Sequence, residues 1–410
     1  MPHSIRSLLW LGALLLAFAL DAAAAGPKAY VGNFKDNSVS VIDTGTGAVV
    51  ATVPVSTGPH GMSASPDGRT VYVSGDGSSE VSVIDTATDR VARKIDVGKT
   101  PHGLAMAPDG KLLLVGVYGE DRVAFVDTAT QAVVATVPVP KPHTIAIRPD
   151  GKVAYVASQE PGKFALVVVD LSARNVLRTL PLEKTPRDLE FGHDGKALYF
   201  TMAGVNAVAV LDPTSDKIVA QIPTGASPHI AGFYRNASAG TAVVQGPGEL
   251  QLFDPSTNTP LRTIGVGKQP HWMSATADGK QVYVTNEGGN DVTVVDLTSG
   301  KTSTIAVGNA PRKVVVLPVA AAGATASSAK VSIANFAFAP AEITVAPGTT
   351  VSWSNDDAAP HGLAYKDGAK GTDLLLPGAS FSRTFDKPGA YDYACAVHAY
   401  MTGKVIVRVP

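Results

Sequence analysis

Residues 60–97 read HGMSASPDGRTVYVSGDGSSEVSVIDTATDRVARKIDV, and the architecture of most of the chain follows from this unit. It holds four short apolar or alternating runs, separated by turn sequences such as Pro66-Asp67-Gly68. Alternation with a period of two predicts β-strands, and Pro, Asp and Gly between such runs predict tight turns. The unit is therefore expected to form a four-stranded antiparallel sheet, which alone could not bury both of its faces.

The same unit recurs about every 42 residues up to Leu317, a period typical of propeller blades. Stacking such sheets radially buries their faces against one another. The run from Tyr30 matches a second strand, whereas the run Lys313–Leu317 matches a first strand and would complete the blade begun at the N-terminus. We therefore expect an all-β chain with a seven-bladed β-propeller over residues 26–317. One aspartate per unit is expected to accept backbone N–H groups in a turn: Asp43, Asp85, Asp127, Asp170, Asp212, Asp254 and Asp296.

The stretch Tyr283-Val-Thr-Asn286 and its near copies resemble the signature of YVTN-type β-propeller repeats. The copies are Tyr30–Asn33, Tyr72–Gly75 and Tyr155–Ser158. The resemblance covers nearly 300 residues and implies the propeller fold. It implies little about function, because such propellers serve as scaffolds, docking surfaces and enzyme frameworks.

Charge and cysteine content exclude several classes of function. The 34 Lys and Arg residues are balanced by 35 Asp and Glu residues, so the basic surplus of a nucleic-acid binder is missing and no nucleic-acid partner is expected. Cys395 is the single cysteine of the chain. It excludes an intramolecular disulfide, zinc sites built from several cysteines, and binuclear copper centres with two bridging thiolates.

The first 25 residues have the order of a secretory signal. Arg6 supplies a positive charge, Leu8–Leu20 form an uncharged apolar run, and Ala22–Ala25 offer small residues for cleavage. The apolar run is shorter than the roughly 20 residues that a transmembrane helix needs. We expect residues 1–25 to be a cleaved signal peptide, no membrane span, and a periplasmic or secreted protein.

A basic residue follows proline at the entry to the first strand of each unit. First strands line the channel of a propeller, so these side chains are candidates for a ring at one rim. Neutral imidazole suits copper, and one interpretation is a second metal or cofactor site in the channel. The other, which we favour, is that the basic residue belongs to the repeat pattern. The seven residues are His60, His102, His143, Arg187, His229, His271 and Arg312.

The pattern changes after Pro318. Residues 318–328 are small and uncharged, which predicts a linker between domains. Residues 329–410 contain apolar runs without the 42-residue period, and they predict a second β domain. His361, Cys395, His398 and Met401 stand out there.

The last three of these residues form a C-x2-H-x2-M sequence in a short loop, whereas His361 lies upstream in another loop. One thiolate and two imidazoles with a weak thioether are the ligands of blue copper, and the short gaps suit a tight loop. An unpaired thiol is a liability in an oxidising compartment, which favours a metal ligand over a structural cysteine.

This region resembles the small cupredoxins, and the amicyanins most closely. The resemblance implies a Greek-key β-sandwich with one type 1 copper per chain. It implies Cys395, His361 and His398 as equatorial ligands and Met401 as the axial ligand. It also implies that Asn355, behind the ligands, ties the two ligand loops together.

The sequence departs from the cupredoxin pattern at one point. Ala396-Val397 stand where the family usually has Pro, which leaves the reduction potential open. The resemblance also implies an apolar patch where partners dock, with Pro360, Leu363, Ala399 and Tyr400 as candidates.

Three functions follow from these patterns. The favoured one is an exported electron carrier, not an enzyme, whose propeller is a docking scaffold for a redox protein that donates or accepts the electron. The alternative is a copper-dependent oxidoreductase with a second metal or cofactor at the propeller ring. Copper storage or delivery is a third reading, disfavoured because the chain has only six methionines.

Overall fold

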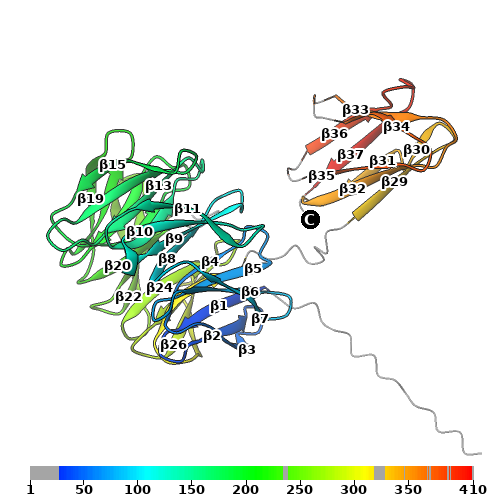
Figure 1. Cartoon of the computed structure of the whole chain (residues 1–410). Helices are drawn as coiled ribbons and strands as arrows, with labels where there is room; N and C mark the ends of the chain where they lie inside the picture. Colours follow the sequence, from blue (N-terminus) through cyan, green and yellow to red (C-terminus); the bar gives the residue numbers. More distant parts are fainter. Residues whose placement is uncertain are drawn as a thin grey trace, which may run out of the picture.

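The computed structural model describes residues 27–233, 239–317, 328–345, 347–366, 368, 371–385, 387 and 389–408. The expected signal peptide and all but the last residue of the expected linker lie outside these ranges. Within them every regular element is a strand except the 3-10 turn η1 (Tyr118–Glu120), so the all-β prediction is confirmed (Figure 1).

The described residues between 27 and 317 form seven four-stranded antiparallel sheets, as the seven repeats predict. Their strands, in order of hydrogen bonding, are β28 (Pro311–Val316), β1 (Lys28–Asn33), β2 (Ser38–Asp43), β3 (Ala48–Pro54); β4 (Pro59–Ala64), β5 (Thr70–Gly75), β6 (Glu80–Asp85), β7 (Arg90–Asp96); β8 (Pro101–Met106), β9 (Leu112–Val117), β10 (Arg122–Asp127), β11 (Ala132–Pro138); β12 (Pro142–Ile147), β13 (Val153–Ser158), β14 (Ala165–Asp170), β15 (Asn175–Pro181); β16 (Pro186–Phe191), β17 (Leu198–Met202), β18 (Ala207–Asp212), β19 (Lys217–Pro223); β20 (Pro228–Gly232), β21 (Gly240–Val244), β22 (Glu249–Asp254), β23 (Thr259–Gly265); and β24 (Pro270–Ala275), β25 (Gln281–Asn286), β26 (Asp291–Asp296), β27 (Thr302–Ala306).

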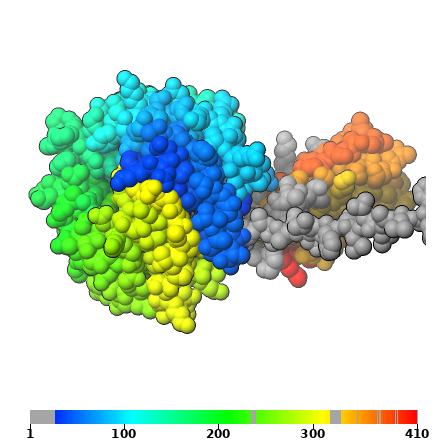
Figure 2. Space-filling model, turned by 90° about the horizontal axis from the view of Figure 1, so that it is seen from below, coloured from blue at the N-terminus to red at the C-terminus, as the bar shows by residue number. Residues whose placement is uncertain are grey.

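The sheets close into a ring. The first strands β4, β8, β12, β16, β20, β24 and β28 contact one another in this order, and β28 contacts β4. Strand β28 pairs with β1 in the register Ala29↔Val316 and Val31↔Val314, which confirms the predicted completion of the first blade. Figure 2 shows the result as blue N-terminal residues beside yellow residues from the end of the propeller. The first strands therefore line a central channel.

Neighbouring blades share their cores. Tyr30 and Val39 of the first blade pack in one cluster with Val71 and Ile84 of the second. The predicted turn role of the repeat aspartates is confirmed, because Asp43 Oδ1, for example, accepts the N–H group of Thr46 at 2.8 Å. Equivalent bonds recur at Asp85, Asp127, Asp170, Asp212, Asp254 and Asp296.

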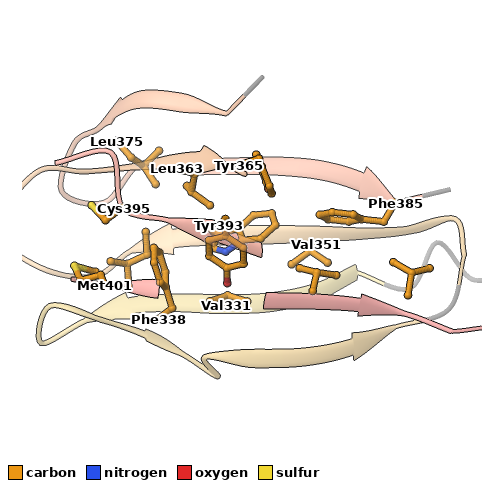
Figure 3. Packing of buried hydrophobic residues seen from close by; sticks show 14 residues of the cluster. Val331, Phe338, Val351, Leu363, Tyr365, Leu375, Phe385, Tyr393, Cys395 and Met401 are labelled. Atoms are coloured by element: carbon orange, nitrogen blue, oxygen red, sulfur yellow. The ribbon is translucent and has the colours of Figure 1, made fainter. Parts of the chain in front are cut away.

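The C-terminal residues form a β-sandwich. One sheet has the order β30 (Ala337–Ala339), β29 (Ser328–Ala334), β32 (Thr349–Asn355), β35 (Ser380–Phe385). The other has the order β31 (Glu342–Val345), β37 (Thr402–Val407), β36 (Gly389–Ala394), β33 (His361–Tyr365), β34 (Thr372–Leu375). Strand β32 alternates buried and half-buried residues, so Val351 and Trp353 face the core with Tyr393 of the opposite sheet. Figure 3 shows this packing between the two sheets.

Candidate metal centre

Two loops bring the predicted ligands together at one end of the sandwich. His361 is the first residue of β33, whereas Cys395, His398 and Met401 lie in the loop between β36 and β37. Two backbone hydrogen bonds close this loop: Cys395 N–H donates to the Met401 carbonyl at 2.9 Å, and Met401 N–H donates to the His398 carbonyl at 3.0 Å. The loop is therefore as tight as its two-residue gaps predict.

Three donor atoms converge at this end. Cys395 Sγ lies 3.6 Å from His361 Nδ1 and 3.8 Å from His398 Nδ1, and the two nitrogens are 3.3 Å apart. The circumradius of a triangle with these sides is about 2.1 Å, close to the roughly 2.0–2.1 Å and 2.3 Å of zinc–nitrogen and zinc–thiolate bonds. A metal ion between the three donors would thus lie within bonding distance of each, and two imidazoles with one thiolate suit copper.

Most of the candidate ligands are shielded from water. His361 is fully buried, and Cys395 and Met401 are each 3% exposed, whereas His398 is half-buried. The side chains of Cys395 and Met401 lie at the same end of the sandwich core (Figure 3). The centre is therefore nearest to solvent on the side of His398.

Asn355 is fully buried behind His361. Its Nδ2 donates to the carbonyls of Ala359 (2.9 Å) and Leu375 (2.8 Å), and its Oδ1 accepts the N–H group of Asp357 at 3.1 Å. These bonds hold the loop before His361. Among the described residues, none of the side-chain bonds of Asn355 reaches the Cys395–Met401 loop.

Two residues at the centre were missed by the sequence analysis. His361 Nε2 donates to Asp357 Oδ2 at 2.9 Å, and the Phe336 ring lies edge-on to both imidazoles, at 5.5 Å from His361 and 5.1 Å from His398. The Phe336 N–H group donates to Asp357 and is the main cause that holds the pKa of that carboxyl below its usual range. The sequence could have predicted Asp357, because it is a carboxylate four residues before a candidate ligand. No nearby sequence feature indicated Phe336.

The structure gives the exposure of the four candidates for the apolar patch and excludes one of them. Pro360, Ala399 and Tyr400 are exposed, Tyr400 by 71%, and Val397 is exposed beside them in sequence. Leu363 was wrongly included: it is 2% exposed and belongs to the sandwich core, because its side chain points inward from β33.

The propeller histidines converge in the channel. The ring of His60 lies 3.7 Å from that of His102, its neighbour in the next blade. It also lies 6.3 Å from His143 and 5.9 Å from His271, although one blade separates it from each. The imidazoles therefore point toward the axis and narrow the channel.

The channel imidazoles are engaged differently from the C-terminal ones. The Nδ1 atoms of His102, His143 and His271 donate to carbonyls of the next blade at 2.9–3.2 Å. Burial lowers the pKa of His143 to about 4 and that of His229 to about 3, so both are neutral at neutral pH. Of the histidine, cysteine and acidic groups in the described residues, only His361, Cys395 and His398 offer three donors within 4.8 Å of one another.

The two arginines of the ring are held by side chains. Arg187 Nη1 donates to Ser227 Oγ at 3.0 Å, and Arg312 Nε donates to Glu287 Oε1 at 3.1 Å. The guanidinium of Arg312 also stacks on Phe34, 3.6 Å from the ring centre. Both guanidinium groups are therefore engaged by neighbouring side chains.

Comparison with known proteins separates the two parts of the chain. Residues 11–109 match the family model of YNCE-like β-propellers, and residues 325–408 match that of copper binding proteins of the plastocyanin/azurin family. Amicyanin of Paracoccus versutus is 38% identical over 96 residues, which cover 22% of this chain and 73% of the amicyanin. Amicyanin-alpha of Methylorubrum extorquens is 37% identical over 90 residues, which cover 21% of this chain and 76% of the amicyanin-alpha.

Solved structures resemble the propeller. Hydrazine synthase of Kuenenia stuttgartiensis aligns with a TM-score of 0.61 at 20% identity, over 70% of this chain and 99% of that one. Apo AztD from Citrobacter koseri aligns with a TM-score of 0.56 at 17% identity, over 71% of this chain and 98% of AztD. At these identities the likeness establishes the fold alone.

No helix in the described part of the chain is long and apolar enough to cross a membrane. The copper-binding family match covers the domain in which the thiol and the two imidazoles converge, and the amicyanins match a comparable length of chain. Through this domain the chain belongs to the plastocyanin/azurin family of copper-binding proteins, whose site takes type 1 copper.

Proposed function

We propose that this protein is an exported blue-copper electron carrier, with one copper held by His361, Cys395, His398 and Met401. The observation that carries the proposal is the convergence of Cys395 Sγ with two imidazole Nδ1 atoms, 3.3–3.8 Å apart. Copper bound by such donors supplies one-electron redox chemistry.

The protein around the site suits electron transfer because it resists rearrangement. The loop bonds at Cys395 and Met401 and the bonds of Asn355 hold the donors in place. A site that keeps its geometry in both oxidation states has a low barrier to electron transfer. The half-buried His398 lies next to exposed Val397 and Ala399 in the loop, so we propose this end as the place where a redox partner docks.

We further propose that the propeller is a docking scaffold for that partner. Three of its channel imidazoles link neighbouring blades through Nδ1–H bonds to backbone carbonyls, and the described residues of the ring do not bring three donor atoms within 4.8 Å of one another, which supports a structural role for the ring. Residues 1–25 would direct export, and residues 318–328 would connect the two domains. The oxidoreductase alternative requires a second metal or cofactor at the ring, and the donor geometry of the described residues favours the C-terminal centre instead.

Reversible redox cycling of the full-length copper protein tests the proposal. The oxidised protein is titrated with ascorbate and then with ferricyanide while its visible absorption and bound copper are followed. We expect one electron per chain in each direction, without loss of copper, and no such cycle for Cys395→Ser. Copper that leaves on reduction would support storage or delivery, and a wild-type protein that cannot be cycled would contradict the proposal.

A further inference from the structure

Asp357 joins the candidate metal centre to a distant turn of the same domain. Its Oδ2 accepts hydrogen bonds from His361 Nε2 and from the backbone N–H of Phe336, both at 2.9 Å. Its Oδ1 accepts the N–H group of Asn335 at 2.6 Å. We propose that Asp357 is a positioning residue that sets both the orientation of His361 and the reduction potential of the centre; this inference rests on the proposed electron-carrier function.

The bond to Asp357 determines which nitrogen of His361 can bind a metal. A carboxylate only accepts, so Nε2 carries the proton, and the lone pair of the neutral imidazole is on Nδ1. Nδ1 is also the atom that lies 3.6 Å from Cys395 Sγ and 3.3 Å from His398 Nδ1. Asp357 thus fixes the tautomer and the ring plane that the three-donor arrangement needs, as carboxylates behind metal-binding histidines generally do.

The same carboxylate holds the turn that carries Phe336. Asn335 and Phe336 have φ values of 53° and 56°, in the left-handed region, which asparagine tolerates but which is unfavourable for phenylalanine. Their two N–H groups both donate to Asp357, which offsets this cost. The turn places the Phe336 ring edge-on to the imidazoles of His361 and His398. One side chain therefore bonds both to a candidate ligand and to the turn that places an aromatic ring against the two imidazoles.

The charge of Asp357 should favour the oxidised state. A carboxylate bonded to a ligand imidazole makes that ligand more basic and stabilises Cu(II) more than Cu(I). Partners of this kind are worth about 10–100-fold in metal affinity. If Asp357→Asn lowers the Cu(II) affinity tenfold more than the Cu(I) affinity, the potential rises by about 59 mV, the one-electron equivalent of a tenfold change.

Asp356 provides a matched control. It is the adjacent carboxylate, and its Oδ2 accepts from the hydroxyls of Ser332 (2.6 Å) and Ser354 (3.3 Å). Asp356→Asn therefore removes the same charge at almost the same place without touching a ligand. A general electrostatic effect would move the potential equally in both variants.

The experiment compares the full-length wild type, Asp357→Asn, Asp357→Ala and Asp356→Asn. Their Cu(II) and Cu(I) affinities are measured by competition with chelators, their potentials by redox titration, and the folding of the copper-free proteins by circular dichroism. We expect Asp357→Asn to lose at least tenfold in Cu(II) affinity, to lose less in Cu(I) affinity and to have a raised potential, with a larger loss for Asp357→Ala. Asp356→Asn should stay within about twofold of the wild type.

The outcomes separate this inference from the function on which it rests. Equal potentials and affinities in Asp357→Asn and Asp356→Asn would overturn the role of Asp357 while leaving the electron carrier intact. Equal losses of Cu(I) and Cu(II) affinity would also overturn the control of potential. A wild-type protein without a coloured copper site would instead contradict the proposed function.

Discussion

The protein holds two clusters of imidazoles that were both candidates for metal binding and that differ in the arrangement of their donor atoms. The propeller channel gathers five histidines, and the C-terminal sandwich gathers two. In the channel, three of the Nδ1 atoms donate to backbone carbonyls of the neighbouring blade. In the sandwich, the Nδ1 atoms of His361 and His398 face each other and the Cys395 sulfur.

The difference lies in how the donor atoms converge rather than in the number of histidines. A centre needs donor atoms that are free and that converge within bonding distance of one point. In both clusters one ring nitrogen donates a hydrogen bond, Nδ1 of His143 to a backbone carbonyl and Nε2 of His361 to Asp357, so the other nitrogen carries a lone pair. Convergence makes the difference, because among the described residues only His361, Cys395 and His398 bring three donor atoms within 4.8 Å of one another. The predictions below test this contrast.

The largest difference is expected for single-histidine substitutions. His361→Ala should lower the Cu(II) affinity by more than about 100-fold and remove the intense visible absorption, because partners behind the ligands are already worth 10–100-fold. His60→Ala should leave both unchanged. Chelator competition on the full-length proteins measures the affinities. Equal losses of affinity in both variants would contradict the difference between the two clusters.

Acid should destabilise the propeller through its channel imidazoles. Burial lowers the pKa of His143 from 6.5 to about 4, so between these pH values the unfolded chain binds a proton that the folded chain does not. The free energy of unfolding should therefore fall with decreasing pH in this window, by about 1.4 kcal/mol per pH unit for each such imidazole. The contribution of the neutral His143 imidazole to the free energy of unfolding is complete above pH 6.5.

Denaturant unfolding between pH 7.5 and pH 4 measures this dependence. His143→Asn keeps an N–H donor but does not titrate, so its slope should be shallower. The exposed His193, replaced by Asn, is the matched control and should keep the wild-type slope. Identical slopes for all three proteins would refute the link between the channel and acid stability.

Gly103→Ala tests how closely the blades meet at the ring. An added Cβ would lie 2.2 Å from the His143 carbonyl oxygen and 2.9 Å from Thr144 Cα, both backbone atoms. We expect a loss of about 1–3 kcal/mol in propeller stability, as for other overpacked positions. The copper absorption should not change. Gly265→Ala is the control, because nothing lies within 4 Å of its added Cβ; equal unfolding midpoints would contradict the close approach.

The smallest effect is expected for the copper content after removal of two channel imidazoles. His102→Phe combined with His229→Phe should leave about one copper per chain and an unchanged visible spectrum. Elemental analysis of the purified protein provides the count. A wild-type protein that binds two copper ions, one of which the double variant lacks, would favour the oxidoreductase alternative.

Much of the fold could be predicted because it repeats locally. The 42-residue period gave the seven sheets, and the phase of the run Lys313–Leu317 gave the pairing of β28 with β1. The tight loop of the centre could also be predicted, since Cys395, His398 and Met401 are close together in the sequence. These features depend on short-range patterns of strands and turns.

The rest depended on contacts between distant segments. Phe336 meets His361 only because a left-handed turn returns to the centre, which no sequence pattern predicted. The side chain of Leu363 points inward because of the register of β33 in its sheet. The sequence alone did not show which residues of this strand face the core. The direction of the channel imidazoles also required the closed ring, as the distance between His60 and His271 shows.

The number and colour of bound copper ions test the central claim most directly. The purified full-length protein is loaded with Cu(II), freed of loosely bound metal, and examined by elemental analysis together with visible and electron paramagnetic resonance spectroscopy. The account predicts one copper per chain and an intense thiolate-to-copper absorption at the red end of the visible range, which Cys395→Ser abolishes. A colourless Cu(II) protein, or an absorption that persists without the Cys395 sulfur, would contradict it.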